Sequence, residues 1–330
     1  MKFILFIFFL YLFFSYNKIL LVEKCQIIEN FKEFCFLKSQ NKYNKNLSNE
    51  KYEKLLKSWY KKRTNLNLDI NNPKTLNEKV QWLKLYDSTP IKTLLADKYL
   101  VKNYIKNKIG EKYVIPLLKV WDSYKNINFN SLPNKFVLKA NHGSGMNIII
   151  YNKKKTNIKK IKKIAKKWMK KNYAFENGYE FHYMNIKPKI IAEKYFENIK
   201  GDLYDYKVYC FDGRVESIAF LSGKKTFRRI AFFDSQWNRL NYTDTYPPFE
   251  KKIPKPNKLN EMIKISQILS KGFAFVRIDF YILNNGEIKF GEMTFTPNSG
   301  LINFNPKEQD RIFGEMIKLP NKSLIPKKII

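Results

Sequence analysis

The chain has 330 residues, which at roughly 150 residues per domain predicts about two domains and is long enough to bury a core unaided. Hydrophobic residues make up 44% and aromatic residues 16%, a composition that excludes a disordered chain although 28% of the residues are charged. The net charge of +33 indicates an anionic partner, and nucleic acid, a membrane surface, an acidic glycan or a nucleotide all fit that charge.

The N-terminal end begins with an apolar run. Residues 3–16 carry no charge, Asn17 and Lys18 interrupt the run, and it continues to Val22. Its length is close to that of a membrane span, but a secretory signal peptide and a buried helix also fit. Several lysines follow, so an anchor at residues 3–22 would leave the rest of the chain on the cytoplasmic side. We therefore expect a cytoplasmic protein in which residues 1–22 are a candidate membrane anchor.

Residues 23–112 are predicted to form a helical N-terminal region. The sequence here is rich in Lys and Asn and lacks the alternation that is typical of strands. Thr75 followed by Glu78 predicts a capping box that opens a helix over 76–86. A second helix is predicted over 93–107.

Strands are predicted to dominate after residue 112. Short β-rich runs alternate with turn residues, and two helical segments interrupt them. The dipeptide Asp212-Gly213 predicts a two-residue hairpin turn. The expected strands cover 114–121, 135–141, 147–152, 189–196, 206–211, 214–220, 227–234, 273–283 and 287–295, and the expected helices cover 156–172 and 257–271. This order predicts an α+β fold, with one lobe over 113–197 and a second over 198–330.

Cysteine and histidine offer little chemistry. Cys25, Cys35 and Cys210 are widely spaced and form no C-x-x-C motif, so neither a zinc site nor a disulfide framework is supported, and a reducing compartment is expected. The chain has only two histidines, His142 and His182, which leaves few residues from which to form a Ser-His-Asp triad or a histidine metal site. Carboxylates and lysines must carry any catalysis.

Two acidic residues are predicted to face one another near the C-terminus. If residues 285–286 form a type I′ turn, strand pairing places Asp279 opposite Glu292. On the same side Arg277 faces Thr294, and the other side is apolar. The side-chain roots of a directly opposed pair lie ~4.5 to 5.5 Å apart.

Carboxylates this close repel one another unless a cation, a proton or a neighbouring base neutralises them. Their oxygens suit a hard cation such as Mg²⁺, which proteins commonly hold together with substrate phosphates. The alternative is an ordinary surface ion-pair cluster made by Arg277. The residues alone leave both interpretations open.

A glycine-containing loop joins two of the predicted strands. Lys139 precedes the loop His142-Gly143-Ser144-Gly145, whose backbone N–H groups could approach phosphate oxygens closely. The loop feeds a strand and not a helix, so it matches neither the Walker nor the Rossmann motif, and it could simply turn the chain. We expect the histidine to form hydrogen bonds within the loop and not to act as a catalyst.

The strand over 189–196 is a candidate adenine-binding segment. It carries Glu193, Lys194 and Tyr195, and a strand that leaves its sheet can offer both backbone groups and a polar acceptor to an adenine. The alternative is an edge strand that closes a sheet.

Taken together, these stretches resemble the TupA-like (teichuronopeptide-biosynthesis-like) branch of the ATP-grasp superfamily, often met among polysaccharide genes. The resemblance covers about Pro73 to Pro320 and rests on ADKYLVKNYI, LPNKFVLKANHGSGMNIII, KPKIIAEKYF, DYKVYCFDGRV and VRIDFYILNNGEIKFGEMTFTPNSG. It implies an ATP-grasp fold of two α+β lobes, the smaller over 113–197 and the larger, with the metal site, over 198–330.

The resemblance also implies roles for individual residues. Asp279 and Glu292 would hold Mg²⁺, and Arg277 would stabilise charge on the transferred phosphoryl group. The superfamily usually shows Glu-x-Asn at the second metal strand, where this chain has Thr294. The Thr294 hydroxyl can still serve as a metal ligand, whereas Asn298 lies too far along to replace the missing amide simply. ATP would be held by Lys98, Lys139, His142, Gly143, Ser144, Gly145, Glu193, Lys194 and Phe196.

The implied activity is an ATP-dependent carboxylate–amine ligase that acts through an acyl phosphate, in cell-surface polysaccharide biosynthesis. Lys207, Arg228 and Arg229 would meet the acceptor or donor, or would be solvated surface charge. The partners would be ATP, a carboxylate-bearing substrate such as a uronic-acid glycan, and an amine. The lysine-rich helix over 158–171 could also meet an anionic membrane surface.

Three other activities are weighed against the ligase. A glycosyltransferase is disfavoured because no two Asp residues are separated by one residue, as the common sugar-nucleotide metal motif requires. An ATP-grasp phosphotransferase would use the same nucleotide site. Specific nucleic-acid binding is not expected, because the chain shows no matching signature.

Overall fold

A computed structural model describes residues 47–196, 204–223 and 227–321 of the protein, and the described residues from Asn49 onward belong to one compact unit. The predicted anchor at 3–22, Cys25 and Cys35 lie outside the described residues. Cys210 is a buried free thiol. Within the described ranges, no helix is both long and apolar enough to cross a membrane.

The N-terminal part of the described chain is helical, as predicted. Helix α3 begins after Thr75, whose side chain and that of Glu78 form the expected capping box. The predicted helix over 93–107 is wrong, because the chain breaks at Asp97 into two helices. The helices are α2 (Asn49–Thr64), α3 (Leu76–Tyr86), α4 (Pro90–Ala96) and α5 (Val101–Ile109).

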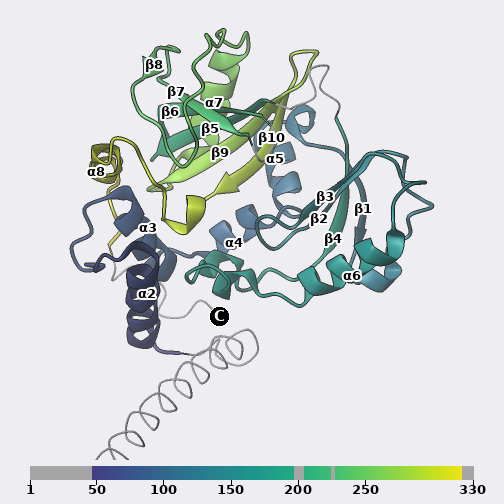
Figure 1. Ribbon diagram of the computed structural model, residues 1–330, viewed down its shortest axis with the longest axis horizontal. Coiled ribbons are helices and arrows are strands. Elements are labelled where there is room, and N and C mark those ends of the chain that lie inside the picture. Colours follow the sequence, from purple (N-terminus) through teal and green to yellow (C-terminus); the bar gives the residue numbers. More distant parts are fainter. Residues whose placement is uncertain (1–46, 197–203, 224–226, 322–330) are drawn as a thin grey trace, which may run out of the picture. The chain divides into compact units, whose positions relative to one another are not determined.

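A four-stranded antiparallel sheet follows, in the order β1-β4-β2-β3. Its strands are β1 (Leu117–Trp121), β2 (Phe136–Ala140), β3 (Asn147–Ile150) and β4 (Ile190–Lys194). Helix α6 (Ile158–Met169) covers one face, because its stripe of Ile161, Ala165 and Trp168 packs into the same core as the strands (Figure 1).

The second sheet has six strands in the order β10-β9-β5-β6-β7-β8. They are β5 (Tyr204–Phe211), β6 (Arg214–Ser222), β7 (Arg229–Phe233), β8 (Arg239–Leu240), β9 (Val276–Ile282) and β10 (Ile288–Thr294). The predicted turn at Asp212-Gly213 is confirmed, since Phe211 pairs with Arg214 and both turn residues have positive φ. Each sheet is therefore drawn from one of the two predicted lobes.

Helices connect the two sheets. Helix α7 (Leu259–Ser270) and helix α5 contribute to the core of the six-stranded sheet, while Lys102 of α5 pairs with Glu193 of β4. In Figure 1, α5 lies between the sheets. Helix α8 (Glu308–Met316) packs against α3. Short 3-10 helices cover Glu111–Tyr113, Tyr124–Asn126, Tyr173–Phe175, Phe181–Tyr183 and Pro297–Ser299.

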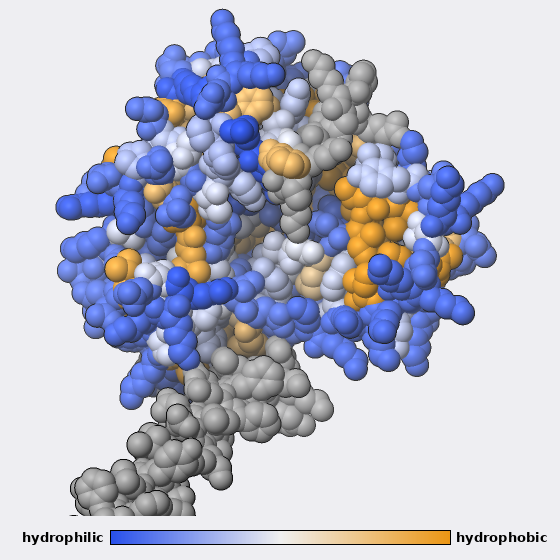
Figure 2. All heavy atoms as spheres, in the orientation of Figure 1, coloured by the Kyte–Doolittle hydropathy of each residue, from blue (hydrophilic) through white to orange (hydrophobic). Residues whose placement is uncertain are grey.

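Polar side chains cover most of the visible surface, as the composition predicts. Figure 2 shows a largely hydrophilic face with an apolar patch over the four-stranded sheet. On the edge strand β3 and just beyond it, Ile149 and Tyr151 are exposed.

Candidate active site

Three neighbouring strands carry the predicted metal site on one face of the six-stranded sheet. Because side chains alternate along a strand, the residues between these positions, such as Ile278, point into the core on the other face. Cross-strand pairing forms two rows, with Lys207, Asp279 and Glu292 in one and Tyr209, Arg277 and Thr294 in the other.

The predicted facing of Asp279 and Glu292 is confirmed, but the predicted turn is wrong. Leu283 and Glu287 close the hairpin, so the loop has one more residue than a type I′ turn, and the pairing next to it is shifted. A bulge between Phe290 and Glu292 restores the predicted register. At the bulge, a side chain on Gly291 would place its Cβ 2.9 Å from the Asp279 carbonyl oxygen, so only glycine fits.

Asp279 is buried and surrounded by cations. Arg277 donates to both of its carboxylate oxygens, from Nε at 2.7 Å and from Nη2 at 2.8 Å, and Lys207 donates at 2.6 Å. Lys207 also pairs with Asp205 at 2.8 Å. Burial opposes the charge of Lys207, but Asp279 and Asp205 hold its pKa above the ordinary value. Arg277 and Lys207 are therefore both at the site, bound to its deeper carboxylate, and Lys207 is not solvated surface charge.

Glu292 is the more accessible carboxylate, with 32% of its side chain exposed against 4% for Asp279. Lys98 lies 3.2 Å from one of its oxygens, Arg277 lies 3.6 Å from the other, and Thr294 donates a hydrogen bond at 3.1 Å. Burial would raise the pKa of Glu292, but Lys98, Arg277 and Lys207 hold that pKa at about 2. Glu292 is therefore ionised at neutral pH.

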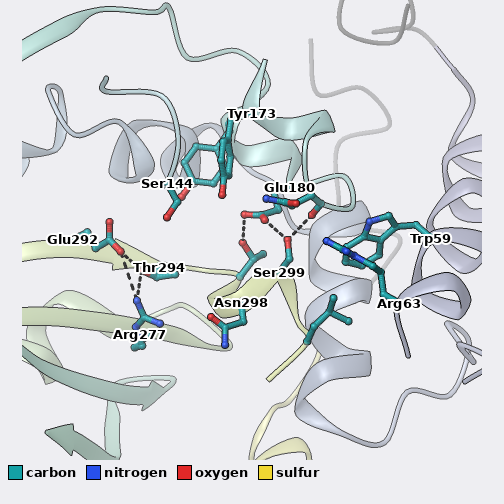
Figure 3. Close-up of a pocket in the computed structure, with 14 residues that line it drawn as sticks. Trp59, Arg63, Ser144, Tyr173, Glu180, Arg277, Glu292, Thr294, Asn298 and Ser299 are labelled. Carbon is teal, nitrogen blue, oxygen red and sulfur yellow. Dashed lines mark hydrogen bonds and ion pairs between the residues drawn. The ribbon is translucent and has the colours of Figure 1, made fainter. Parts of the chain in front are cut away.

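Lys98 joins this pair to the glycine-containing loop. Its Nζ donates to the Gly143 carbonyl at 2.9 Å, and its backbone N–H donates to Asn141 at 3.1 Å. Gly143 has no room for a side chain, because a Cβ would lie 2.5 Å from the Tyr173 ring. Ser144 is exposed, and Figure 3 shows its side chain directed toward Glu292 and Thr294.

His142 faces inward, as expected for a hydrogen-bonding loop residue. One ring nitrogen lies 3.2 Å from the Asn141 side-chain oxygen and the other lies 3.1 Å from the Trp168 carbonyl oxygen. The ring is buried, and burial lowers its pKa. These contacts fit a role in shaping the loop better than a role in contacting a nucleotide.

The predicted adenine-binding segment differs in part from expectation. Strand β4 lies between β1 and β2, so the alternative of an edge strand is wrong. Glu193 is buried and pairs with Lys102 and Lys139, each at 2.6 Å. Burial would raise its pKa, but the two lysines hold that pKa at about 2. At the strand's end, the Lys194 ammonium lies 5.5 Å from the centre of the Phe196 ring.

Two cavities open onto the site and share Ser144, Arg277, Glu292 and Asn298. One has a volume of about 330 Å³ and brings Lys207 and Arg228 to the site, and its basic side chains outnumber the two carboxylates, Asp244 and Glu292, that also line it. We call it the cationic cavity. The other has a volume of about 340 Å³ and extends to α2. Arg229 is not brought there, since it donates to the Pro248 carbonyl.

Several residues at the site were not expected from the sequence. Asn298 lines both cavities although it lies beyond the metal strand, because the chain turns back there with a left-handed backbone at φ 48°. Glu180 and Ser299 line the second cavity and are hydrogen-bonded to one another. No spacing in the sequence links Glu180 to the other two, since 119 residues separate it from Ser299.

The residues present fit a metal ion that is shared with a nucleotide. In the described part of the chain, no group of three or more His, Cys, Asp or Glu side chains could hold a metal ion by itself. Asp279 and Glu292 supply two carboxylates and Thr294 a hydroxyl, which suits Mg²⁺ completed by phosphate oxygens.

Three solved structures are similar to parts of the chain. They are D-alanine–D-alanine ligase from Bacillus anthracis (17% identity, 62% of this chain and 58% of that chain, TM-score 0.39), N5-carboxyaminoimidazole synthetase from Staphylococcus aureus complexed with ADP (18%, 69% and 53%, TM-score 0.41), and D-cycloserine synthetase DcsG (12%, 68% and 70%, TM-score 0.39). The chain thus spans a little over half the length of the first two. No curated protein matches the chain.

A family model described as TupA-like ATPgrasp matches residues 78–318. The match includes both sheets, the glycine-containing loop, Lys98 and the paired carboxylates, and it covers most of the chain. The chain therefore belongs to the TupA-like ATP-grasp family.

Proposed function

We propose that this protein is an ATP- and Mg²⁺-dependent carboxylate–amine ligase that acts through an acyl phosphate. The observation that carries the proposal is the contact of Lys98 with both the glycine-containing loop, at Gly143, and the exposed carboxylate of Glu292. Loop, lysine and carboxylate pair thus form one charged unit, which a triphosphate and its metal ion could bridge.

The reaction has two steps. A substrate carboxylate oxygen attacks the γ-phosphorus of ATP, the bond from that phosphorus to the bridging oxygen breaks, and ADP leaves with the electron pair. The amine nitrogen then bonds to the acyl carbon while the carbon–oxygen bond to phosphate breaks. An ammonium nitrogen loses two protons on the way to the amide, one to solvent and one to the inorganic phosphate that leaves.

Positioning and charge neutralisation would supply the catalysis. Arg277, fixed by two hydrogen bonds to Asp279, presents a guanidinium at the junction of the cavities, where negative charge develops in both steps. Mg²⁺, held by Asp279, Glu292 and Thr294, would neutralise the phosphate charge when bound. Lys98 would leave Glu292 for a phosphate oxygen.

The nucleotide would lie between the sheets. Lys139 and Lys102 would contact its phosphates from β2 and α5, and Lys194 and Phe196 would bound the adenine at the end of β4. The pairing of Glu193 with the two lysines supports a role for this carboxylate in holding them in place, in addition to any contact with the base. Ser144 and Gly145 would cover the phosphates.

The cationic cavity supports a carboxylate-bearing donor. Three basic residues, Lys207, Arg228 and Arg277, line it against two carboxylates, one of which is the proposed metal ligand Glu292, so an anionic group is attracted to the point where phosphoryl transfer would occur. A uronic-acid glycan has this chemistry, and we propose a role in cell-surface polysaccharide biosynthesis on the cytoplasmic side of the membrane.

The test is to identify which nucleotide the purified protein consumes. It is incubated with Mg·ATP, a uronic-acid oligosaccharide and an amino-acid mixture, and in parallel with UDP-sugars in place of ATP. We expect ADP and inorganic phosphate in equal amounts, only when the carboxylate is present, and a product mass that corresponds to an amide.

The same assay separates the alternatives. Release of UDP without ADP would establish a glycosyltransferase instead. ADP with a phosphorylated product and no free phosphate would establish a phosphotransferase. Hydroxylamine added in place of the amine should trap the acyl phosphate as a hydroxamate, and its absence during carboxylate-dependent turnover would contradict the acyl phosphate.

A further inference from the structure

The second cavity reaches from the candidate catalytic centre to a part of the chain outside the family match. It begins at Arg277 and Glu292 and ends at Trp59 and Arg63 of α2, which precedes the matched residues 78–318. Figure 3 shows the two ends on opposite sides of Glu180 and Ser299. A molecule in this cavity would touch the reacting centre with one end and α2 with the other.

Glu180 places a buried carboxylate in the wall of this cavity. Only 4% of the residue is exposed, and its two oxygens accept hydrogen bonds from Thr296, at 2.7 Å, and from Ser299. A carboxylate has about four lone-pair sites, so Glu180 keeps the capacity to accept further hydrogen bonds. Burial raises its pKa, and the nearby Lys84 opposes that rise. An ammonium group in the cavity would donate to the remaining lone pairs and, as Lys84 does, favour the charged form of Glu180.

Lys84 lies near Glu180 and interacts with it through charge. It is fully buried and donates to the side chain of Gln81 at 2.8 Å and to the Ser299 carbonyl at 2.6 Å. Because the lysine is tied to these acceptors and does not line the cavity, it can balance the charge of Glu180 while the carboxylate face toward the cavity stays available.

Arg63 supplies the opposite charge at the outer end. It is exposed and lies 5.9 Å from the centre of the Trp59 ring, and it pairs with no carboxylate in the part of the chain that the structure describes. Figure 3 shows its side chain lying along Trp59 and directed toward Ser299. Trp59 packs closely against Gly178, where a Cβ would lie 2.6 Å from the ring, and the Lys84 ammonium lies 4.6 Å from the ring centre. The arginine therefore stands on a rigid support and has a free fork of donors for an anion.

We infer that this cavity is the amine subsite and that it takes an amine bearing its own anionic group, such as an amino acid, with the ammonium group on Glu180 and the anionic group on Arg63. This inference rests on the proposed ligase function. It is consistent with the division of charge between the cavities, because the donor carboxylate would occupy the cationic one. The two substrates would then meet at Arg277 and Glu292, which line both.

The test measures binding and does not need turnover. The full-length protein is loaded with Mg²⁺ and a non-hydrolysable ATP analogue and screened by saturation-transfer NMR against the common amino acids. The best ligand is titrated beside its carboxamide and its N-acetyl derivative. We expect each blocked form to bind at least tenfold more weakly than the free amino acid.

Variants assign the two ends. Arg63→Gln should weaken binding of the amino acid at least tenfold and leave binding of its carboxamide unchanged. Arg63→Lys should keep part of the affinity for the amino acid because it keeps the charge. Lys61→Gln, an exposed neighbour on the same helix, is the control and should bind as the wild type does. Glu180→Gln should remove the preference over the N-acetyl derivative, provided that the variant melts as the wild type does.

The inference is overturned if the loaded protein binds no amino acid, or if Arg63→Gln weakens the amino acid and its carboxamide equally. Failure of the ligase proposal looks different, because the protein would then not bind the ATP analogue, or would consume ATP without a carboxylate. A protein that passes the ATP tests and fails the amino-acid titration retains its proposed function and loses this subsite.

Discussion

Asp279 and Glu292 differ in their surroundings although strand pairing sets them opposite one another. Asp279 has both oxygens bonded to cations of the protein, whereas Glu292 is partly exposed and contacts Lys98. Arg277 and Lys207 form the ion-pair cluster that was the alternative interpretation, and the cluster still presents Glu292 to both cavities. The metal site stays a prediction. Glu292 is the better position at which to test metal binding.

Glu193 gives a prediction for the dependence of stability on pH. Its pKa is about 2 in the folded protein against an ordinary 4.5, so its ion pairs stabilise the fold fully above pH 4.5. As the pH falls toward 2, the unfolded chain takes up the proton first and this stability is lost, at about 1.4 kcal/mol per pH unit.

Urea unfolding at pH 5.5 and at pH 3.5 measures the effect. Between the two pH values, the free energy of unfolding should fall by about 1 kcal/mol more in the wild type than in Glu193→Gln, since the variant has no carboxylate at position 193 to protonate. Other carboxyl groups with a lowered pKa, such as that of Glu292, titrate in both proteins, so their contributions cancel in the comparison. Equal losses would show that Lys102 and Lys139 do not stabilise the charged form.

At the scale of elements, the break between α4 and α5 positions Lys98. Asp97 accepts hydrogen bonds from the backbone N–H groups of Tyr99, at 2.8 Å, and Leu100, at 3.2 Å, and from the Asn141 side chain at 3.0 Å. These bonds end one helix, start the next and attach the turn to the glycine-containing loop.

Asp97→Ala should therefore lower the free energy of unfolding by about 1 to 2 kcal/mol and raise the KM for ATP severalfold. Asp97→Asn keeps the acceptor for the two backbone N–H groups but turns an NH2 group toward the Asn141 amide nitrogen, so it should fall between the wild type and Asp97→Ala in both. Thermal melts and the ADP assay make the comparison. An unchanged KM in Asp97→Ala would mean that the turn does not position Lys98.

The bulge at Gly291 is the second element that builds the site. Gly291→Ala should lower the free energy of unfolding by about 1 to 3 kcal/mol and lower turnover at least tenfold. The reason is that the new methyl group meets the Asp279 backbone and shifts Glu292. Gly286→Ala in the hairpin loop is the control, since it strains a residue at φ 78° with open space around it. It should cost about 1 kcal/mol and leave turnover unchanged. Equal turnover in both variants would remove the role of the bulge.

The order of strands was predictable and these local devices were not. Short β-rich runs bounded by turn residues predicted every strand but the short β8, because β-branched and aromatic residues suit the half-buried surface of a sheet. The helix break at Asp97 was missed because the apolar pattern continues across it. The sequence predicts a hairpin with a shorter loop and no bulge. The longer loop shifts the register by one residue and the bulge shifts it back, so the predicted pairing of Asp279 with Glu292 is still correct.

The second cavity was not predictable for a different reason. Lys84, Glu180 and Ser299 belong to three distant segments, and no local pattern marks residues that meet only in the folded chain. Asn298 was set aside for its distance along the chain, whereas a left-handed turn returns it to the site.

At the scale of the whole molecule, the excess positive charge is concentrated on α6 and its flanks. Residues 153–171 contain no acidic residue, and the exposed face of α6 is made of lysines. We expect this face to bind anionic membranes through charge, since the apolar stripe of the helix is already buried in the core.

Vesicle sedimentation tests this expectation. Replacing Lys159, Lys160, Lys163 and Lys167 by Gln should reduce binding to phosphatidylglycerol vesicles at least fivefold and leave binding to phosphatidylcholine vesicles unchanged. The control replaces Lys54, Lys61, Lys251 and Lys252 and makes the same change in net charge elsewhere. Equal losses in the two variants would assign the binding to net charge and not to α6.

The proposed activity depends on a divalent ion shared by Asp279, Glu292 and the triphosphate of ATP. Calorimetric titration of a non-hydrolysable ATP analogue, with and without Mg²⁺, tests this most directly in the wild type, in Glu292→Gln, and in Glu287→Gln, which changes an exposed carboxylate on the same hairpin. We predict that Mg²⁺ tightens binding of the analogue at least tenfold in the wild type and in Glu287→Gln, and has no effect in Glu292→Gln. Without Mg²⁺, Glu292→Gln should bind the analogue as well as the wild type or better, because a negative charge is gone. The same Mg²⁺-dependent gain in all three proteins would contradict the account.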